Sequence, residues 1–429
     1  MFIKYIFLLI LTFSFHANAV VKIDSWFTDK GSKVFFVQNN DLPIVDVEVS
    51  FMAGSAYDKD ESAGRASLTN HMMLLGSGNL KQEEIINQFS EIGAEISSGF
   101  DEDKSSFSLR TLSEKKEEAF KLFQTVLHRP NFDEDVLNRE KKRYLSSIKQ
   151  SDTLPDSIGK KAFMKAIYGE HTYAIPSSGT LDSIESITND TLIRFYESAY
   201  SAKSAVIVIV GDLSKKEAFD FANQTSNDLP SNGQLRSIEK VKLTPSQTIK
   251  IEHPSSQAHL HYGYPIMKRG DEDFFPLYVG NYILGGGGFV SRLTEEVREK
   301  KGYVYSVYSY FMPMQEKGPF QIGLQTKKEQ IDEAFKLVRK VVKDFIDNGP
   351  SENELAAAKS NMIGGFPLRL DSNKKIMNYI SMMAFYNYPL DYLETFSDKV
   401  NSVTTEQIKD AFQRRVILEE FTTVIVGAS

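Results

Sequence analysis

A repeat of about 216 residues constrains the fold of this 429-residue chain more than any other feature of its sequence. Three short matches recur in the same order and at nearly the same offset. One such match would be chance, but three in order indicate that the chain consists of two duplicated halves. The matches are EAFKL at 118–122 and 333–337, IT at 187–188 against VT at 403–404, and VIVG at 208–211 and 424–427.

Both halves show the same order of predicted elements. A strand of alternating polarity leads into a helix, further strands follow, and a series of helices precedes a closing apolar strand. Such a mixture predicts an α+β fold in which each half has a sheet covered by helices. The helices are expected near 64–76, 80–93, 114–128 and 133–151 in the first half, and near 274–284, 291–300, 328–348 and 352–363 in the second.

Capping signals support several of these helix starts. Asp133 is a favourable N-cap residue, and Ser351 with Glu354 has the spacing of a capping box, as does Thr404 with Gln407. Each predicted start therefore has a local physical reason as well as a periodic pattern.

The strand that closes each half is apolar throughout. These strands, 205–210 and 422–426, lack the alternation of a strand with one solvated face. We therefore expect both to be buried on both faces. The turn-rich stretch that follows the first of them predicts a linker at 229–248, between an N-terminal domain 20–228 and a C-terminal domain 249–429.

The N-terminus resembles a cleavable secretory signal peptide. Lys4 precedes an apolar run of about eleven residues, which is too short to span a bilayer as an anchor. Ala17-Asn18-Ala19 fits the small-residue cleavage pattern, so we expect residues 1–19 to be removed after Ala19. This predicts a periplasmic or secreted protein with no membrane segment after cleavage.

Composition excludes some kinds of chemistry. The chain has no cysteine, which rules out disulfides, thiolate metal sites and a cysteine nucleophile. The formal net charge of −7 argues against nucleic acid as a partner, but it does not argue against peptides.

One helix of the first half resembles the metal-binding helix of the pitrilysin/insulinase family of zinc peptidases, whose motif is H-x-x-E-H. In the matching segment, Ser67 stands at the first ligand position, Asn70 at the general-base position, and only His71 is retained. A helix places residues i, i+3 and i+4 on one face, so the family's motif directs two imidazoles and a carboxylate at one metal. Serine is a poor zinc ligand, and an asparagine amide cannot take a proton from water.

The family's third ligand is a glutamate seven residues after another glutamate on a later helix. Here Glu140 matches the first of these, but Ser147 stands at the ligand position. Catalytic zinc needs three protein ligands and an open position. We therefore expect this chain to bind no zinc, and His71 taken alone is most simply an ordinary helix histidine.

A segment of the second half resembles the family's C-terminal substrate segment. A turn of four glycines, Gly285, Gly286, Gly287 and Gly288, precedes S-R-L, and Arg298 is followed seven residues later by Tyr305. No G-K-[ST] follows the glycines, so a nucleotide-binding loop is excluded. The resemblance implies that the glycine turn, Arg298 and Tyr305 contact substrate; taken alone, Arg298 reads as a solvated helix charge and Tyr305 as a strand aromatic.

The resemblance implies two halves arranged as a clamshell, in a noncatalytic subunit that pairs with a homologous H-x-x-E-H chain. The partner would hold the zinc, and a peptide would bind by adding to a sheet edge. Three alternatives stay open: a peptide-binding or chaperone-like protein without such a partner, a purely structural pseudo-peptidase, and a hydrolase with a relocated metal. For the last, the candidate ligands are Asp101, Glu102 and Asp103, which usually form a solvated turn. Separately, His259 and His261 share one strand face, which suits either a two-histidine metal site or simply solvent-facing or core histidines.

Overall fold

The structure is a computed structural model that describes residues 22–231, 233 and 237–427. The predicted signal peptide, 1–19, lies outside the described residues, as do positions 232 and 234–236 of the predicted linker. Within the described ranges, no helix has the length and apolar character needed to cross a membrane.

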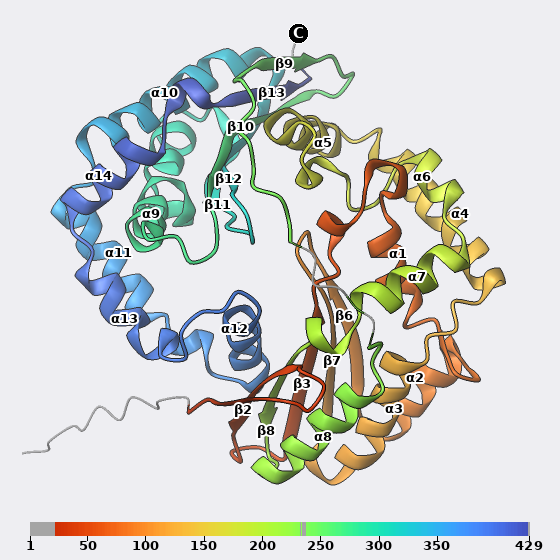
Figure 1. Cartoon of the computed structure of the whole chain (residues 1–429). Coiled ribbons are helices and arrows are strands. Elements are labelled where there is room, and N and C mark those ends of the chain that lie inside the picture. The colour runs from red at the N-terminus through yellow and green to blue at the C-terminus, as the bar shows by residue number, and fades with distance from the viewer. Residues whose placement is uncertain (1–21, 232, 234–236, 428–429) are drawn as a thin grey trace, which may run out of the picture.

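The first half is built on a six-stranded sheet with strand order β1-β2-β8-β3-β7-β6 (Figure 1). Its strands are β1 Asp24–Phe27, β2 Lys33–Gln38, β3 Ile44–Phe51, β6 Glu95–Phe100, β7 Ser105–Leu112 and β8 Val206–Gly211, and a small ribbon pairs β4 Gly76–Ser77 with β5 Leu80–Lys81. Its helices are α1 Arg65–Met72, α2 Gln82–Glu91, α3 Lys116–His128, α4 Glu134–Ser151, α5 Pro155–Tyr168, α6 Leu181–Ser186, α7 Asn189–Ala199 and α8 Lys215–Asn227.

The second half repeats this plan on a five-stranded sheet with strand order β11-β12-β10-β13-β9. Its strands are β9 Thr248–Ile251, β10 Gln257–Met267, β11 Val304–Phe311, β12 Gly318–Lys327 and β13 Thr422–Val426. Its helices are α9 Phe274–Asn281, α10 Ile331–Asn348, α11 Glu352–Gly364, α12 Asn373–Phe385, α13 Tyr392–Ser402 and α14 Thr405–Arg415.

The two closing strands lie inside their sheets, as the apolar pattern predicts. β8 pairs with β2 on one side and β3 on the other, and β13 pairs with β10 and β9. Every residue of both strands is buried. The predicted caps are also present, because Asp133, Ser351 and Thr404 each accept a backbone N–H of the first helical turn.

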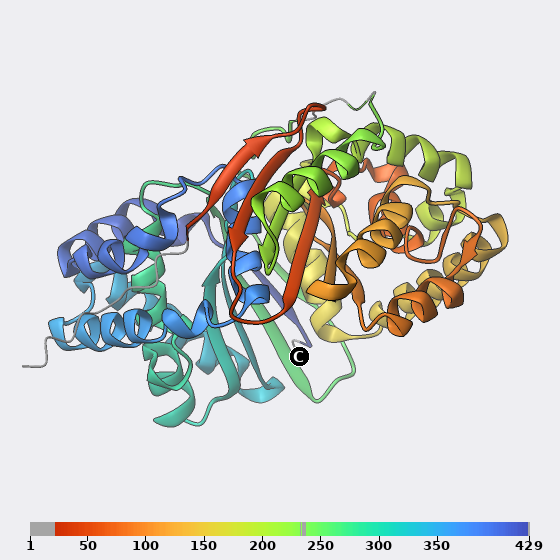
Figure 2. The same cartoon turned by 90° about the horizontal axis from the view of Figure 1, so that it is seen from below.

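Each half gives one helix to the sheet of the other half. α5 comes from the first half but packs on β10 and β13 of the second sheet, and α12 comes from the second half but packs on β3 and β8 of the first. Figures 1 and 2 show the two sheets as the arms of a clamshell, joined through these exchanged helices. The predicted α+β clamshell of two homologous halves is therefore confirmed.

Two predicted helices of the second half differ in kind from an ordinary α-helix. The helix expected over 274–284 is α only to Asn281 and continues as a π-helix, Tyr282–Gly286. The helix expected over 291–300 is a π-helix as well, Thr294–Glu299. The first includes Gly285 and Gly286 of the predicted glycine turn, the second begins six residues after Gly288, and π-helical turns occur often at functional sites.

Candidate functional site: a metal-type helix pair and a second-half substrate segment

The helix that carries the degenerate motif is held firmly at its N-terminus. The carboxylate of Asp58 accepts the backbone N–H of Ala66 at 3.1 and 3.2 Å, and it accepts Nε of Arg65 at 3.1 Å. Burial of Asp58 raises the pKa of its carboxyl to about 6 despite these donors. An anion at a helix N-terminus stabilises the helix, so the position of α1 does not depend on a metal.

Asn70 performs a structural task at the general-base position. Its side-chain amide donates to Oγ of Ser105 at 2.6 Å and to the backbone oxygen of Gly99 at 3.3 Å. These bonds tie α1 to strands β6 and β7. A carboxylate at this position would have no proton to offer either acceptor, so the amide suits the contacts that the chain makes here.

His71 and Glu140 bond to each other rather than to a metal. Nε2 of His71 lies 3.0 Å from Oε2 of Glu140, and the carboxylate also accepts Nε of Arg139 at 2.9 Å and NH1 of Arg143 at 3.3 Å. Burial acts to raise the pKa of Glu140, but the hydrogen bonds from His71 and Arg139 outweigh it, and the net pKa lies below the usual value. The retained imidazole is thus the donor to an internal carboxylate.

Ser67 forms the second link between the same two helices. Its hydroxyl lies 3.2 Å from the hydroxyl of Tyr144, whose ring centroid is 6.0 Å from that of His71. The sequence analysis missed Tyr144, although its place four residues after Glu140 puts both on one helix face. The two links show that α1 and α4 run antiparallel, with Ser147 exposed one turn beyond Tyr144.

A zinc ion does not fit these residues. Serine side chains stand at two ligand positions, and the one imidazole is used by Glu140. Among residues 22–231, 233 and 237–427, no group of three or more His, Cys, Asp or Glu side chains could hold a metal ion. The site is a set of hydrogen-bonded cross-links in the place where the resembling peptidases hold zinc.

In the second half, the side chain of Arg298 is partly exposed and Tyr305 is exposed. The guanidinium of Arg298 stacks 4.9 Å from the ring of Phe289, and its Nε is 3.6 Å from a carboxylate oxygen of Glu299. Ion pairs this exposed contribute little. Tyr305 begins the edge strand β11 at a bulge in its pairing with β12, and it is 52% exposed. No contact joins either residue to Ser67, Asn70 or His71 within the described chain, so their substrate role stays a prediction.

Close packing explains much of the glycine turn. A Cβ on Gly285 would lie 2.4 Å from Oγ of Ser309, and Gly288 has a φ of +63°, which glycine adopts at least cost. The next two residues, Phe289 and Val290, are 71% and 73% exposed. Close packing at Gly285 and the positive φ of Gly288 explain why glycine stands at these two positions, with no need to invoke a ligand. The role of Gly285–Gly288 in substrate binding remains a prediction.

The histidine pair does not form a metal site. His259 and His261 line one cavity of about 300 Å³ with Asp156, as a shared strand face predicts. However, His261 is buried, its Nδ1 is 2.8 Å from the side-chain amide of Gln321, and its Nε2 faces Gly159 of α5. Burial lowers the pKa of His261 to about 4, so this imidazole is a neutral packing group between α5 and the second sheet.

The acidic run at 101–103 is not the solvated turn that its composition indicates. Asp103 is 1% exposed, and burial raises the pKa of Asp101 to about 6. Oδ1 of Asp103 accepts the hydroxyl of Tyr173, and Oδ2 accepts the hydroxyl of Tyr386, so the carboxylate is saturated by protein donors. The run serves contacts between the halves rather than a relocated metal.

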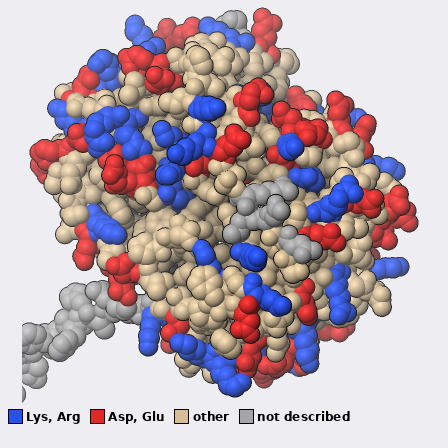
Figure 3. All heavy atoms as spheres, viewed as in Figure 1, with Lys and Arg blue, Asp and Glu red and all other residues tan. Residues whose placement is uncertain are grey.

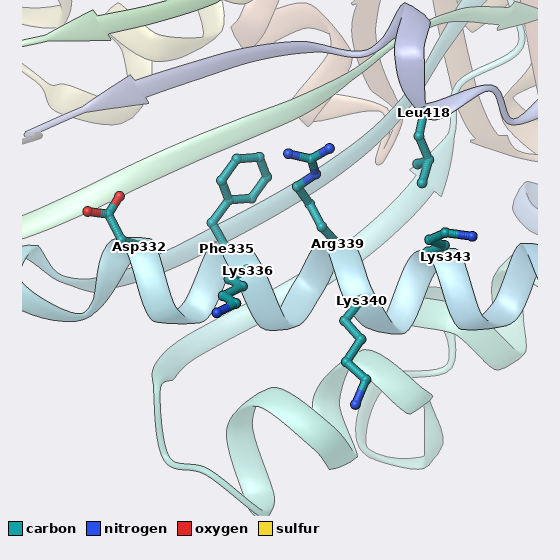
Figure 4. A pocket seen from close by; sticks show the side chains of 7 residues that line it. All are labelled: Asp332, Phe335, Lys336, Arg339, Lys340, Lys343 and Leu418. Atoms are coloured by element: carbon teal, nitrogen blue, oxygen red, sulfur yellow. The ribbon is translucent and has the colours of Figure 1, made fainter.

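Another cavity lies away from all of these residues. It has a volume of about 430 Å³ and lies along α10, with a lining that includes Phe335, Arg339 and Leu418 (Figure 4). On the face drawn in Figure 3, basic and acidic side chains are interspersed rather than gathered by sign. This face lacks the basic stripe that nucleic acid needs.

This geometry defines the class of protein: a duplicated α+β clamshell of the zinc-peptidase type, with hydrogen-bonded cross-links at its metal positions. Residues 33–181 match the family model described as Insulinase (Peptidase family M16), and residues 186–362 match the model described as Peptidase M16 inactive domain. The chain belongs to the M16, or insulinase, peptidase family.

Similar proteins cover nearly the whole chain. A crystal structure of a peptidase M16 inactive domain from Pseudomonas fluorescens has a TM-score of 0.92 and 38% identity, over 95% of this chain and 98% of that one. The curated relatives include an uncharacterized zinc protease, YmxG, of Bacillus subtilis, 26% identical over 93% of this chain and 97% of the relative. A non-peptidase homolog YmxG of Helicobacter pylori is 25% identical over 92% of this chain and 91% of the relative.

Proposed function

We propose that this chain is the noncatalytic, substrate-binding subunit of a heterodimeric zinc metallopeptidase located in the periplasm. The partner would be a homologous chain with an intact H-x-x-E-H motif, and it would hold the zinc. One contrast carries the proposal: Ser67, Asn70 and His71 are engaged in internal hydrogen bonds, whereas Tyr305 is 52% exposed and the side chain of Arg298 is 41% exposed.

The contrast is sharpest within the second-half segment itself. Arg292, six residues before Arg298, is fixed as a structural residue: its Nε and NH2 donate to Glu354 at 2.6 and 2.7 Å, and its NH2 donates to the backbone oxygen of Gly349 at 3.1 Å. Arg298 instead stacks its guanidinium on the ring of Phe289, and its Nε lies 3.6 Å from a carboxylate oxygen of Glu299. One arginine thus anchors the segment to α10 and α11, and the other keeps its donors free for a ligand.

The exposed pair suits a peptide. A guanidinium offers a planar fork of donors to a carbonyl or carboxylate, and a phenol hydroxyl donates to a carbonyl oxygen or to the oxyanion that forms as it is attacked. Arg298 and Tyr305 would bind and orient the scissile region, while the partner supplies the metal and the base. No residue of this chain takes over the proton transfer in this scheme.

The first sheet offers an edge for the rest of the peptide. β6 is the last strand of its sheet and pairs only with β7, so one side of its backbone is unpaired within the sheet. Three of the six residues of β6 are exposed, namely Glu95, Ser97 and Ser98. An extended peptide added along β6 would gain backbone hydrogen bonds that do not depend on its sequence.

Reconstitution with a partner tests the proposal. The mature chain is co-expressed with a homologous H-x-x-E-H chain encoded beside it, and cleavage of a quenched fluorescent peptide library is measured for each chain and for the complex. Only the complex should cleave. Replacing Arg298 by Ala should lower kcat/KM by about a hundredfold or more, because a transition-state donor is lost.

The matched control is Lys301→Ala, an exposed cation three residues along the same segment with no ion pair in the described structure. It should leave kcat/KM within about twofold, because an exposed charge remote from the substrate contributes little. Equal losses in the two variants would mean a general effect of charge. Unchanged kinetics in Arg298→Ala would remove Arg298 from the mechanism.

A peptide-binding protein without a catalytic partner is the second candidate, because an exposed Arg298 and Tyr305 also suit binding alone. Fluorescence anisotropy with labelled unfolded peptides separates the two. Tight binding by the chain alone, with no gain in cleavage from any H-x-x-E-H chain, would favour this candidate. Absence of both binding and cleavage would favour a purely structural role.

A further inference from the structure

The two exchanged helices end in the same way. α5 ends at Tyr168, followed by Gly169 with a φ of +58°, and α12 is followed by Tyr386 and then Asn387 with a φ of +56°. The two tyrosines are 218 residues apart, close to the offset of the sequence repeat. They therefore occupy equivalent positions in the two halves, each just before a left-handed turn.

The two tyrosines make reciprocal contacts across the halves. The hydroxyl of Tyr168 donates to the backbone oxygen of Lys317 at 2.9 Å, in the turn between β11 and β12. The hydroxyl of Tyr386 donates to Oδ2 of Asp103 at 2.8 Å, in the turn between β6 and β7. Each exchanged helix is thus bonded at its end to the hairpin of the sheet that it covers.

Asp103 joins these contacts into one cluster. Its Oδ1 accepts the hydroxyl of Tyr173 at 2.7 Å, and its Oδ2 also accepts the backbone N–H of Gln315 at 2.8 Å. The hydroxyl of Tyr173 in turn accepts the backbone N–H of Glu316 at 3.1 Å. Two backbone donors of the second half are therefore satisfied by side chains of the first half.

The turn that carries Asp103 is also held by hydrogen bonds within the first half. Oδ1 of Asp101 accepts the backbone N–H of Asp103 at 2.9 Å and that of Lys104 at 2.7 Å. The backbone oxygens of Asp101 and Glu102 accept the N–H groups of Ser55 and Ala56. A buried carboxylate that accepts three hydrogen bonds, two of them from the other half, would lose partners in any relative movement of the halves.

We infer that Asp103 is a positioning residue: it clasps the two hairpins, makes the two halves one rigid body, and fixes the position of strand β11 relative to the first half. β11 runs from Val304 to Phe311 directly into the clasped turn. The clasp therefore sets where Tyr305 stands relative to the first half. The inference that Asp103 makes the two halves rigid does not depend on the proposed function. The inference that it positions Tyr305 rests on the proposed function.

A distance measurement tests the clasp without any partner. Because the chain has no native cysteine, two spin labels can be placed at Glu117→Cys on α3 and Ser360→Cys on α11, both exposed and one in each half. Double electron–electron resonance on the otherwise unchanged chain should give one narrow distance distribution. Asp103→Ala should broaden it or add a second population, and Asp103→Asn, which keeps the shape and one acceptor oxygen, should restore most of it.

Single hydroxyl deletions keep the test decisive if Asp103→Ala does not fold. Tyr386→Phe removes one bond across the halves and should also broaden the distribution. Tyr388→Phe is the matched control, because its hydroxyl accepts the backbone N–H of Gly270 at 3.0 Å within the second half. Folded Asp103→Ala or Tyr386→Phe protein with the unchanged narrow distribution would overturn the clasp.

A double-mutant cycle in the active complex tests the positioning of Tyr305. In the otherwise unchanged chain, Tyr305→Phe should lower kcat about a hundredfold. In the Asp103→Ala background the same substitution should lower kcat about tenfold or less, because the hydroxyl of Tyr305 is already misplaced there. Equal costs in both backgrounds would overturn the positioning role. If no partner confers activity, the proposed function fails, and the distance result is unaffected.

Discussion

Two substitutions should turn the α1–α4 cross-links into a metal site. The variant carries Ser67→His and Ser147→Glu and keeps His71. The geometry supports convergence of the three positions: Ser67 lies one helical turn from His71, and Ser147 lies one turn from Tyr144, whose hydroxyl is 3.2 Å from Oγ of Ser67. Three ligands and an open position satisfy catalytic zinc.

The cost of the change can be worked from the contacts that it breaks. Loss of the bond between Ser67 and Tyr144 costs about 1 kcal/mol, and release of His71 from the carboxylate of Glu140 costs about 3 kcal/mol at most. Structural zinc sites contribute about 10–16 kcal/mol of apparent binding free energy. The remainder, about 6 kcal/mol at the low end, corresponds to a Kd of tens of micromolar or tighter.

Zinc binding is measured by equilibrium dialysis against about 100 µM free zinc, with elemental analysis of the protein compartment. The double variant should hold about one zinc per chain, and the unchanged chain and the single variant Ser67→His should hold far less. Circular dichroism establishes that the variant is folded. A folded double variant without zinc would show that the three positions do not converge, and would refute the reading of α1 and α4 as a lost metal site.

Three further predictions concern stability. Because the pKa of His261 is lowered to about 4, the folded state loses stability as the pH falls from 6.5 toward 4. Between pH 7 and pH 5, the free energy of unfolding measured in urea should fall by about 2 kcal/mol for this reason. The variant His261→Gln should not show this loss. Glu140→Gln should lower the free energy of unfolding by about 1–2 kcal/mol at pH 7. Since the pKa of Glu140 in the folded state lies below 4.5, this difference from the unchanged chain should vanish as the pH falls through the folded pKa. Gly285→Ala should cost about 1–3 kcal/mol because its Cβ would lie 2.4 Å from a buried hydroxyl oxygen, whereas Gly364→Ala, with nothing within 4 Å, should be neutral or stabilising; equal melting temperatures for these two variants would contradict the packing argument.

Local signals in the sequence predicted the elements and their duplication. The apolar runs that became β8 and β13, and the caps at Ser351 and Thr404, act over a few residues and need no tertiary information. The resemblance of residues 64–77 to the family's motif supplied the positions of Ser67 and His71, and helical spacing then placed both on one face of α1.

Contacts between residues far apart in the chain could not be predicted in this way. The exchange of α5 and α12 depends on which sheet each helix meets, and helical periodicity does not encode that choice. Asp103 resembles a solvated acid in its local sequence, because its donors Tyr386 and Gln315 lie more than two hundred residues away. π-Helical turns likewise follow from packing around the glycine turn rather than from helix propensity.

The zinc content of the unmodified mature chain tests the central claim most directly. The chain is purified alone and in complex with the proposed H-x-x-E-H partner, dialysed without chelator, and analysed for metal. The account predicts little or no zinc in the chain alone and about one zinc per heterodimer, held by the partner. One tightly bound zinc in the isolated chain would contradict the account, because the metal would then have ligands other than those at Ser67, Asn70 and Ser147.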